Sequence, residues 1–271
     1  MTALPLIGSR LDRYRLSRLV ADHGASGTYL ADDLALNRTV RLTAVAVGDG
    51  EAPGVTALLR RVAAYEHQHA LSLYDAGVED GVAYLVHPAV QYASLADVVR
   101  ARRRLDADDL LVLAQQIASA LDAGHASGLS HGQLTADRVL LPPRSAGWFA
   151  VIDGMGVSMV EAVGASARAG LLPPPMEVSA GPDVAALGRL LFFGLVGRAM
   201  AGSAHPDYGH LGASTGTDRA ADARRDLPPA IDDVFAGSQQ MAPPVYADSA
   251  ALVRAARDVL RGANRHTVIQ A

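Results

Sequence analysis

The spacing of apolar residues changes character roughly a third of the way along the chain. Before residue 90, short runs such as Tyr14–Val20 and Val40–Val47 alternate apolar with polar residues or are rich in Val and Leu, which predicts β-strands. One stretch in this part, 55–65, has helical spacing instead. Later stretches such as 106–121 and 184–196 carry apolar residues three and four apart, as helices do. The pattern predicts an α+β chain, with a small, mainly β part that holds one helix and a larger helical part.

Shorter sequence patterns predict the remaining strands and helices and the division of the chain into two lobes and a tail. Leu71–Tyr74 and Val82–Val86 are two further strand candidates, and 249–261 is the last expected helix. Gly262 follows the last periodic residue and suits a helix C-cap, so the residues after it are expected to form a loose tail. The expected division is a β-rich lobe at 1–90, a helical lobe at 91–262 and a flexible tail at 263–271.

Composition excludes several classes of function. Half of the 271 residues are hydrophobic, which suits a packed globular chain. The formal net charge is −4 and the tightest basic cluster is Arg102–Arg104, so we expect no nucleic-acid partner. The chain has no cysteine, which removes disulfides, thiolate chemistry and cysteine metal sites. No apolar run is long enough to span a bilayer.

The chain also has no lysine, because all 24 residues counted as Lys or Arg are arginine. Chemistries that need a lysine amine are therefore excluded. They include Schiff-base catalysis and the lysine that grips nucleotide phosphates in P-loop proteins and kinases.

Several segments, taken in order, resemble the bacterial Hanks-type Ser/Thr kinases. Leu129-Ser130-His131 is similar to the start of the catalytic loop, and Val151–Gly156 stands where the metal-binding motif would be. Asp183–Gly188 is similar to the central helix of the large lobe. The resemblance covers nearly the whole chain and implies the two-lobed protein-kinase-like fold, with the β-rich lobe first.

The resemblance places uncharged side chains where kinases carry an ion pair. Aligning Val40–Thr43 on the strand motif of the family puts Thr43 at the phosphate-anchoring lysine. The partner glutamate falls at Leu58, or at Val62 if the helix slips by one turn. Losing both partners leaves no buried unpaired charge, which is what a fold retained for stability alone would show.

The catalytic loop is altered at its chemical positions. Gln133 replaces the aspartate that accepts the substrate proton, and an amide is not a base near neutral pH. Arg138 replaces the metal-binding asparagine and would repel Mg²⁺. Asp153 is retained, either as a weak candidate metal ligand or as an ordinary turn aspartate, and Asp137 could also reach a metal.

These substitutions predict a pseudokinase that is not an enzyme, has no cofactor and acts as an interaction scaffold. Two alternatives stay open. One is a kinase-fold transferase with an atypical metal site built from Asp153 and Asp137. The other is a nucleotide-sensing module without turnover. Both need nucleotide binding, so a thermal shift with ATP and Mg²⁺ or Mn²⁺ separates them from the scaffold.

Thr267 is the only threonine of the expected tail. In bacterial receptor kinases the equivalent juxtamembrane segment carries phosphorylation sites, so the resemblance implies that an active bacterial Ser/Thr kinase modifies Thr267. A forkhead-associated (FHA) domain protein would then bind the phosphothreonine through an arginine-lined pocket. The alternative is a polar tail threonine without a role. A kinase-like dimer is also compatible with the resemblance.

More narrowly, the altered loop at 131–138 and the missing lysine resemble the intracellular pseudokinase segment of actinobacterial MviN proteins, the MurJ-type lipid II flippases. This resemblance implies a role in regulating peptidoglycan precursor export. It also implies a location on the cytoplasmic side of the cell membrane, as the intracellular domain of a larger membrane protein.

Overall fold

The structure is a computed structural model that describes residues 4–22, 24–48, 53–143, 147–171, 178–200, 219–240 and 243–268. Side chains are described in these ranges except for Pro53 and residues 263–268. The chain divides into two compact units. Unit 1 comprises Met1–Gln91, Gly124–Gly132 and Gly154–Val178, and unit 2 comprises Tyr92–Ala123, Gln133–Asp153 and Ser179–Ala271.

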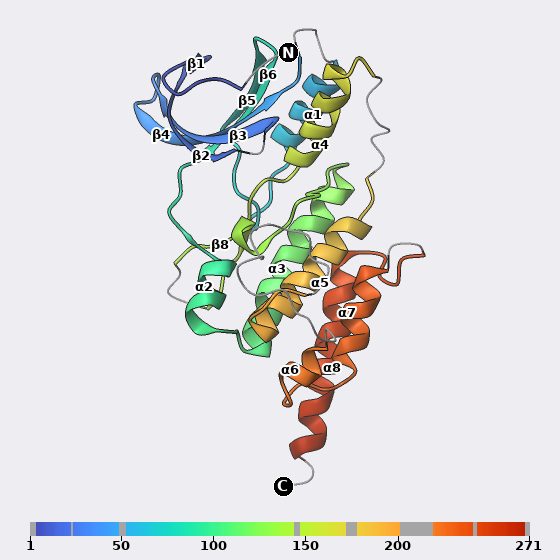
Figure 1. Cartoon of the computed structure of the whole chain (residues 1–271). Helices are drawn as coiled ribbons and strands as arrows, with labels where there is room; N and C mark the ends of the chain where they lie inside the picture. The colour runs from blue at the N-terminus through green and yellow to red at the C-terminus, as the bar shows by residue number, and fades with distance from the viewer. Residues whose placement is uncertain are drawn as a thin grey trace. The chain divides into compact units, whose positions relative to one another are not determined.

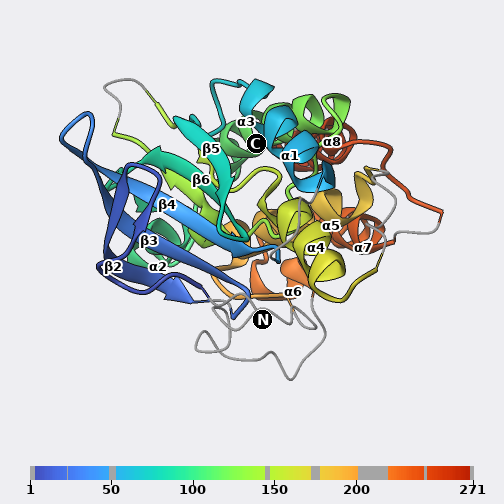
Figure 2. The ribbon, with the colours of Figure 1, turned by 90° about the horizontal axis from the view of Figure 1, so that it is seen from above.

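Unit 1 is built on a six-stranded antiparallel sheet with the order β1-β2-β3-β4-β6-β5, whose larger strands run side by side in Figure 2. The strands are β1 (Arg10–Leu11), β2 (Tyr14–Asp22), β3 (Ser26–Asp33), β4 (Arg38–Ala46), β5 (Asp75–Glu79) and β6 (Val82–Pro88). One face carries a buried apolar cluster that includes Tyr14, Leu16, Leu42 and Val86. Because successive strand residues point to opposite faces, Thr43 faces away from this cluster.

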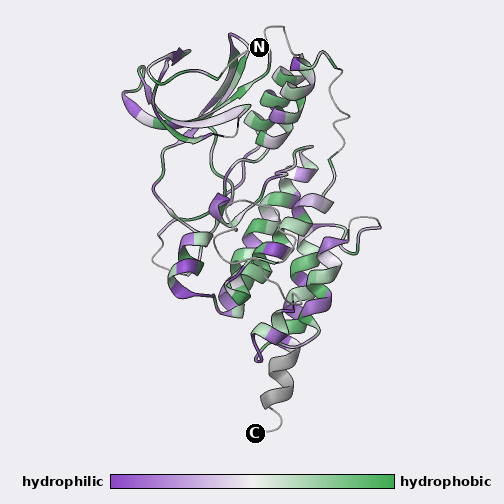
Figure 3. Cartoon of the chain, in the orientation of Figure 1, coloured by the Kyte–Doolittle hydropathy of each residue, from purple (hydrophilic) through white to green (hydrophobic). Residues whose placement is uncertain are grey.

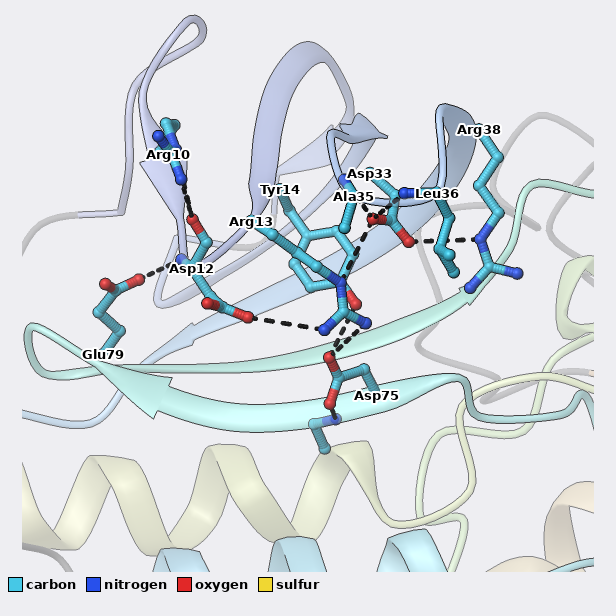
Figure 4. Close-up of polar contacts among 11 residues, drawn as sticks. Arg10, Asp12, Arg13, Tyr14, Asp33, Ala35, Leu36, Arg38, Asp75 and Glu79 are labelled. Atoms are coloured by element: carbon cyan, nitrogen blue, oxygen red, sulfur yellow. Dashed lines mark hydrogen bonds and ion pairs between the residues drawn. The ribbon is translucent and has the colours of Figure 1, made fainter.

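A charged network holds the turn between β3 and β4, as Figure 4 shows. The fully buried Asp33 accepts hydrogen bonds from the backbone N–H groups of Ala35 and Leu36, each at 3.2 Å. Arg38 Nε donates to its other oxygen at 3.3 Å. Arg13 Nε lies 3.3 Å from Asp33 Oδ1, which makes an ion pair without hydrogen-bond geometry. The buried carboxylate is therefore fully compensated by donors and charge.

The same network joins the start of β2 to β5 (Figure 4). Arg13 Nη2 lies 2.9 Å from Asp75, and the Tyr14 hydroxyl donates to the same carboxylate at 2.8 Å. Burial and the bond to Asp75 raise the pKa of Tyr14 far above its ordinary value. Tyr14 therefore stays a neutral donor at all physiological pH values.

Two helices belong to unit 1, α1 (Pro53–Ala64) and α4 (Val157–Arg168), and they lie side by side in Figure 1. α1 forms where the sequence predicts it. Val55, Leu58, Leu59 and Val62 recur at helical spacing and all four are buried.

Unit 2 is mainly helical. Its helices are α2 (Leu95–Arg102), α3 (Ala107–Ala126, of which the part up to Ala123 belongs to this unit), α5 (Gly181–Val196), α6 (Ala220–Ala223), α7 (Ile231–Gln239) and α8 (Ser249–Val268). It also contains the 3-10 helix η1 (Ala136–Arg138) and the strands β7 (Ala93–Ser94), β8 (Val139–Leu141) and β9 (Val151–Ile152). Every residue of α5 from Asp183 to Leu195 except Arg189 is buried, as its continuous apolar sequence predicts. Phe192 of α5 meets Phe235 of α7 edge to face, with 5.5 Å between ring centroids.

The expected strand at Leu71–Tyr74 is wrong, because the strand lies at Asp75–Glu79. This β5 sequence has a low β propensity, yet it pairs with β6 from Asp75 opposite Val86 to Glu79 opposite Val82. Gly77 leaves room for the Tyr84 side chain of the neighbouring strand, because a Cβ at Gly77 would lie 2.5 Å from the Tyr84 hydroxyl oxygen. Pairing with β6 therefore outweighs the low β propensity of the β5 sequence.

Among the described residues, no helix is both long and apolar enough to cross a membrane.

Candidate functional site

Three of the sequence-predicted residues, with the neighbouring Asp137, lie together in unit 2. The 3-10 helix η1 turns Arg138 back toward the preceding loop, where its Nη2 donates to Gln133 Oε1 at 3.3 Å. Asp137 Oδ1 accepts from Arg100 Nη2 of α2 at 3.4 Å. Asp153 directly follows β9, and its backbone N–H donates to the Arg138 carbonyl oxygen at 2.9 Å. The pairing of β8 with β9 thus brings Gln133, Arg138 and Asp153 into one cluster.

The kinase resemblance implies magnesium at this cluster, and magnesium requires several oxygen ligands. Among the described residues, no group bonds to the buried Oδ2 of Asp137, which leaves one acceptor open there. The guanidinium of Arg138 belongs to the same short helix, and its charge opposes a nearby cation. In the described ranges, no three acidic or histidine side chains gather so that they could hold a metal ion. The side chains present do not fit the magnesium site of the kinase family.

Thr43 and Leu58 belong to unit 1. Thr43 lies in the middle of β4, opposite Thr28 of β3 and Leu85 of β6, and is half-buried. Leu58 lies in α1 and is fully buried. A lone carboxylate at this place would lose its hydration, so leucine suits the packing of α1.

Sequence reasoning missed α4, which begins directly after Val151–Gly156, the segment that the resemblance equates with the metal-binding motif of kinases. The signal was present, because Val157, Val160 and Val163 recur at helical spacing and are buried. α4 packs against α1 and β4.

Polar contacts hold α4 at two places within unit 1. Ser26 Oγ at the start of β3 donates to Glu161 Oε1, in the second turn of α4, at 2.5 Å. At the last residue of the helix, the Arg168 guanidinium donates to the Ala46 carbonyl oxygen. The segment after Asp153 is therefore a fixed part of unit 1, and these contacts hold it against the ends of two strands.

Two helical glycines provide a matched test of these element assignments. A Cβ at Gly164 of α4 would lie 2.9 Å from the Ala46 carbonyl oxygen, whereas a Cβ at Gly262 of α8 meets no heavy atom of the described residues within 4 Å. We expect Gly262→Ala to raise the free energy of unfolding by about 0.5–1 kcal/mol through helix propensity. Gly164→Ala should lower it by about 1–3 kcal/mol, because α4 must move away from β4. Urea unfolding followed by circular dichroism measures both changes. A gain at Gly164 would contradict the close α4–β4 contact, and a loss at Gly262 would contradict a helix running through it.

Thr267 lies in the last turn of α8. The expected helix end at Gly262 is wrong, because α8 runs from Ser249 to Val268. A strong start explains part of this, since the Asp122 carboxylate accepts from the backbone N–H groups of Ser249 and Ala250 at 2.9 and 3.0 Å. A glycine inside a helix costs only about 1 kcal/mol, so Gly262 does not stop the helix. The Thr267 side chain falls outside the described part of the structure.

Unit 1 also contains a cavity of about 430 Å³ beside the loop that follows α1, which sequence reasoning did not find. His67 lines it, and the ring centroids of His67 and the buried His69 lie 5.6 Å apart. Burial and the charge of His69 lower the pKa of His67. None of the site residues singled out from the sequence lines this cavity.

The β-rich unit, the helical unit and the cluster around Asp153 define a protein-kinase-like domain. The chain is related to the bacterial Hanks-type Ser/Thr kinases, and the family described as protein tyrosine and serine/threonine kinase matches residues 55–151. Ser/Thr-protein kinase PrkC of Bacillus subtilis is 28% identical over 141 residues, which cover 50% of this chain and 22% of that protein. PknE of Mycobacterium tuberculosis is 28% identical over 155 residues, covering 56% and 27%. The matched segment spans about a quarter of these relatives' length.

Solved kinase structures share the fold. The PknI kinase domain of Mycobacterium tuberculosis aligns with a TM-score of 0.67 at 18% identity, covering 94% of this chain and 99% of that one. Rad53 in complex with AMP-PNP aligns with a TM-score of 0.64 at 16% identity, covering 89% and 64%. The protein-kinase-like fold expected from the sequence is confirmed.

The expectation that the chain is not an enzyme is wrong. The relatives that match by sequence are named Ser/Thr-protein kinases, which points to an enzyme. The expectation rested on side chains missing from motif positions, such as the aspartate replaced by Gln133. Such losses show only that the usual groups are absent from these positions, and they do not by themselves exclude enzyme activity.

Proposed function

We propose that this chain is a signalling domain of the bacterial Ser/Thr kinase type in which phosphorylated Thr267 recruits an FHA-domain protein. The relationship to bacterial Ser/Thr-protein kinases is the observation that carries the proposal. An active kinase of this class is the modifier.

The backbone position of Thr267 supports a phosphorylation-dependent change. Thr267 lies in the last turn of α8, where the helix dipole presents its negative end. A phosphate adds about −1.5 to −2 charge, which is repelled there and favours unwinding of that turn. Unwinding supplies the extended segment that FHA domains bind, so modification and exposure of the motif are coupled.

The test is phosphosite mapping after treatment with an active bacterial Ser/Thr kinase domain, followed by capture on an immobilised FHA domain. We expect phosphate at Thr267, capture that is lost in Thr267→Ala, and a small decrease in helical circular dichroism on modification. Thr39→Ala is the matched control, because Thr39 is exposed on β4 of unit 1. Phosphate elsewhere with unchanged capture by Thr267→Ala would reject the proposal.

In the cell, the proposed setting is the cytoplasmic side of the membrane, as the intracellular domain of a larger membrane protein that exports peptidoglycan precursors. The resemblance to MurJ-type flippases at 131–138 motivates this setting. Thr267→Ala in the producing cell should then change the incorporation of labelled peptidoglycan precursor. Unchanged incorporation, with capture lost in vitro, would reject the setting and leave the recruitment proposal intact.

A second candidate function is an atypical kinase-fold phosphotransferase, which the kinship with named kinases favours. A thermal shift with ATP and Mn²⁺ or Mg²⁺, followed by radiolabelled phosphate transfer to casein, tests it. Asp153→Asn should abolish both signals, whereas the exposed-pair variant Asp32→Asn should keep them. Absence of any shift or transfer in the unmodified chain would reject this function. A nucleotide-sensing module would give the shift without transfer.

A further inference from the structure

Three consecutive arginines, Arg102, Arg103 and Arg104, are exposed where α2 ends, and we call them the arginine cluster. Figure 3 shows the last turn of α2 and the segment after it in the hydrophilic colour. A cation in the last turn of a helix offsets the helix dipole, which accounts for Arg102. Arg103 and Arg104 lie beyond the helix, so the dipole does not account for them.

The backbone of the arginine cluster is held rigidly by unit 2. Arg103 is the C-cap of α2 in a left-handed conformation with φ 70°, which is unfavourable for a residue with a side chain. Its carbonyl lies so close to α5 that a Cβ on Gly197 would be 1.9 Å from the oxygen. Leu105 N–H donates to the Gly194 carbonyl oxygen at 2.8 Å, and the buried Arg224 donates to the Leu105 carbonyl oxygen at 3.3 Å. These contacts hold the backbone of the cluster in one conformation.

Arg102 is further ordered by an aromatic ring. Its guanidinium lies 5.0 Å from the centroid of the half-buried Trp148. The backbone around this ring is anchored by Gln116 of α3, which donates to the Trp148 carbonyl oxygen at 3.0 Å and accepts from Ala150 N–H at 2.7 Å. A guanidinium stacked on a ring keeps its N–H edge free for bidentate contact with a carboxylate.

Among the described residues of unit 2, no acidic side chain forms an ion pair with the arginine cluster. The neighbouring cation Arg100 is already paired with Asp97 at 2.8 Å. Asp226 lies near Arg104, but Arg224 holds both of its oxygens. The described part of the structure places no acidic group within ion-pair distance of the arginine cluster. Within the described ranges, the three exposed guanidinium groups therefore have no ion-pair partner, on a chain whose net charge is −4.

We propose that the arginine cluster docks an acidic, Asp/Glu-rich peptide segment of a partner protein. Arginine clusters recognise acidic motifs, and a preordered cluster loses little conformational entropy on binding. Three charges are fewer than the four to eight basic residues typical of anionic-lipid binding. They also lack the extended basic face of a nucleic-acid site. The proposal concerns a different surface from Thr267 and does not depend on it.

Fluorescence anisotropy with a fluorescein-labelled peptide of alternating Asp and Glu tests the proposal, with the Asn/Gln version of the peptide as reference. The variant Arg102→Gln/Arg104→Gln removes two charges and keeps the strained Arg103 unchanged. The control Arg18→Gln/Arg60→Gln removes the same charge at exposed positions of unit 1. We expect the cluster variant to bind on the order of tenfold more weakly and the control to change less than about twofold. Binding of the unmodified protein should weaken as salt is raised.

Trp148→Leu distinguishes the effect of ordering Arg102 from the effect of its charge, because it removes the ring under Arg102 and leaves the net charge unchanged. We expect about a threefold weaker affinity with unaltered circular dichroism, through loss of the stacking of Arg102. Equal weakening by the cluster and control variants would overturn the proposal. So would equal binding of the neutral peptide, or binding to phosphatidylserine vesicles without binding to the acidic peptide.

Discussion

Replacing Leu58 by glutamate should lower the free energy of unfolding by about 3–5 kcal/mol, because it buries an unpaired carboxylate in α1. Leu58 is fully buried and packs on the face of α1 that carries Val55 and Val62. Urea unfolding followed by circular dichroism measures the loss. Arg60→Glu is the control in the same helix, and its exposed side chain should make the change small. A loss below about 1 kcal/mol at Leu58 would contradict its burial.

Adding Thr43→Lys to Leu58→Glu tests the alignment with kinases. If Thr43 and Leu58 stand at the lysine and glutamate positions, the new lysine meets the new carboxylate and part of the lost stability returns. The double variant should then be more stable than the sum of the single changes predicts. The double variant Thr43→Lys/Val62→Glu tests the alternative alignment, in which the glutamate position lies one helical turn later, at Val62. Recovery with Val62 and not with Leu58 would move the alignment by a turn, and recovery with neither would reject it.

The chain-long pattern of apolar residues was enough to predict the fold class, because periodicity is a local property of the sequence. It placed α1 and α5 correctly, since their buried faces are continuous. It placed β5 four residues too early, since that strand is specified by pairing with β6 and by the Tyr84 ring over Gly77. It ended α8 too soon because Gly262 looks like a stop signal, while the helix continues to Val268. Such errors arise where tertiary packing outweighs local preference.

Only those residues of the candidate site that stand at recognisable motif positions could be predicted from the sequence. Spacing singled out Gln133, Arg138 and Asp153, which the β8–β9 pairing brings together. Nothing local in the sequence indicated that Arg100 would reach Asp137, or that Glu161 would bond to Ser26. These contacts join residues far apart in the chain, so they depend on the fold.

The replaced catalytic side chains at this site led to a wrong prediction about enzyme activity. The prediction that the chain is not an enzyme assumed that only the side chains at the motif positions could carry out the reaction. The kinship with named Ser/Thr-protein kinases contradicts that step.

The Asp33 carboxylate should make the stability of the chain depend on pH. Burial by itself would raise its pKa, but hydrogen bonds from Leu36 N–H, Arg38 and Ala35 N–H, together with the charge of Arg13, lower the pKa below its ordinary value. The folded-state pKa is thus below the unfolded one. The stabilisation is complete above the unfolded value of about 3.9 and is lost as the pH falls through the folded pKa.

Asp33→Asn should therefore lower the melting temperature at pH 7 by several degrees, and its melting temperature should fall less steeply than that of the unmodified chain as the pH drops below about 4. The amide keeps the shape of the side chain but leaves Arg13 and Arg38 without their shared anion. Asp32→Asn is the matched control one residue earlier, because Asp32 forms an exposed pair with Arg15 at 3.2 Å. Exposed pairs contribute little, so its melting temperatures should run parallel to those of the unmodified chain. Thermal unfolding of the three proteins across this pH range decides the matter. If the melting temperature of Asp33→Asn falls with pH in parallel with that of the unmodified chain, another carboxylate causes the acid sensitivity.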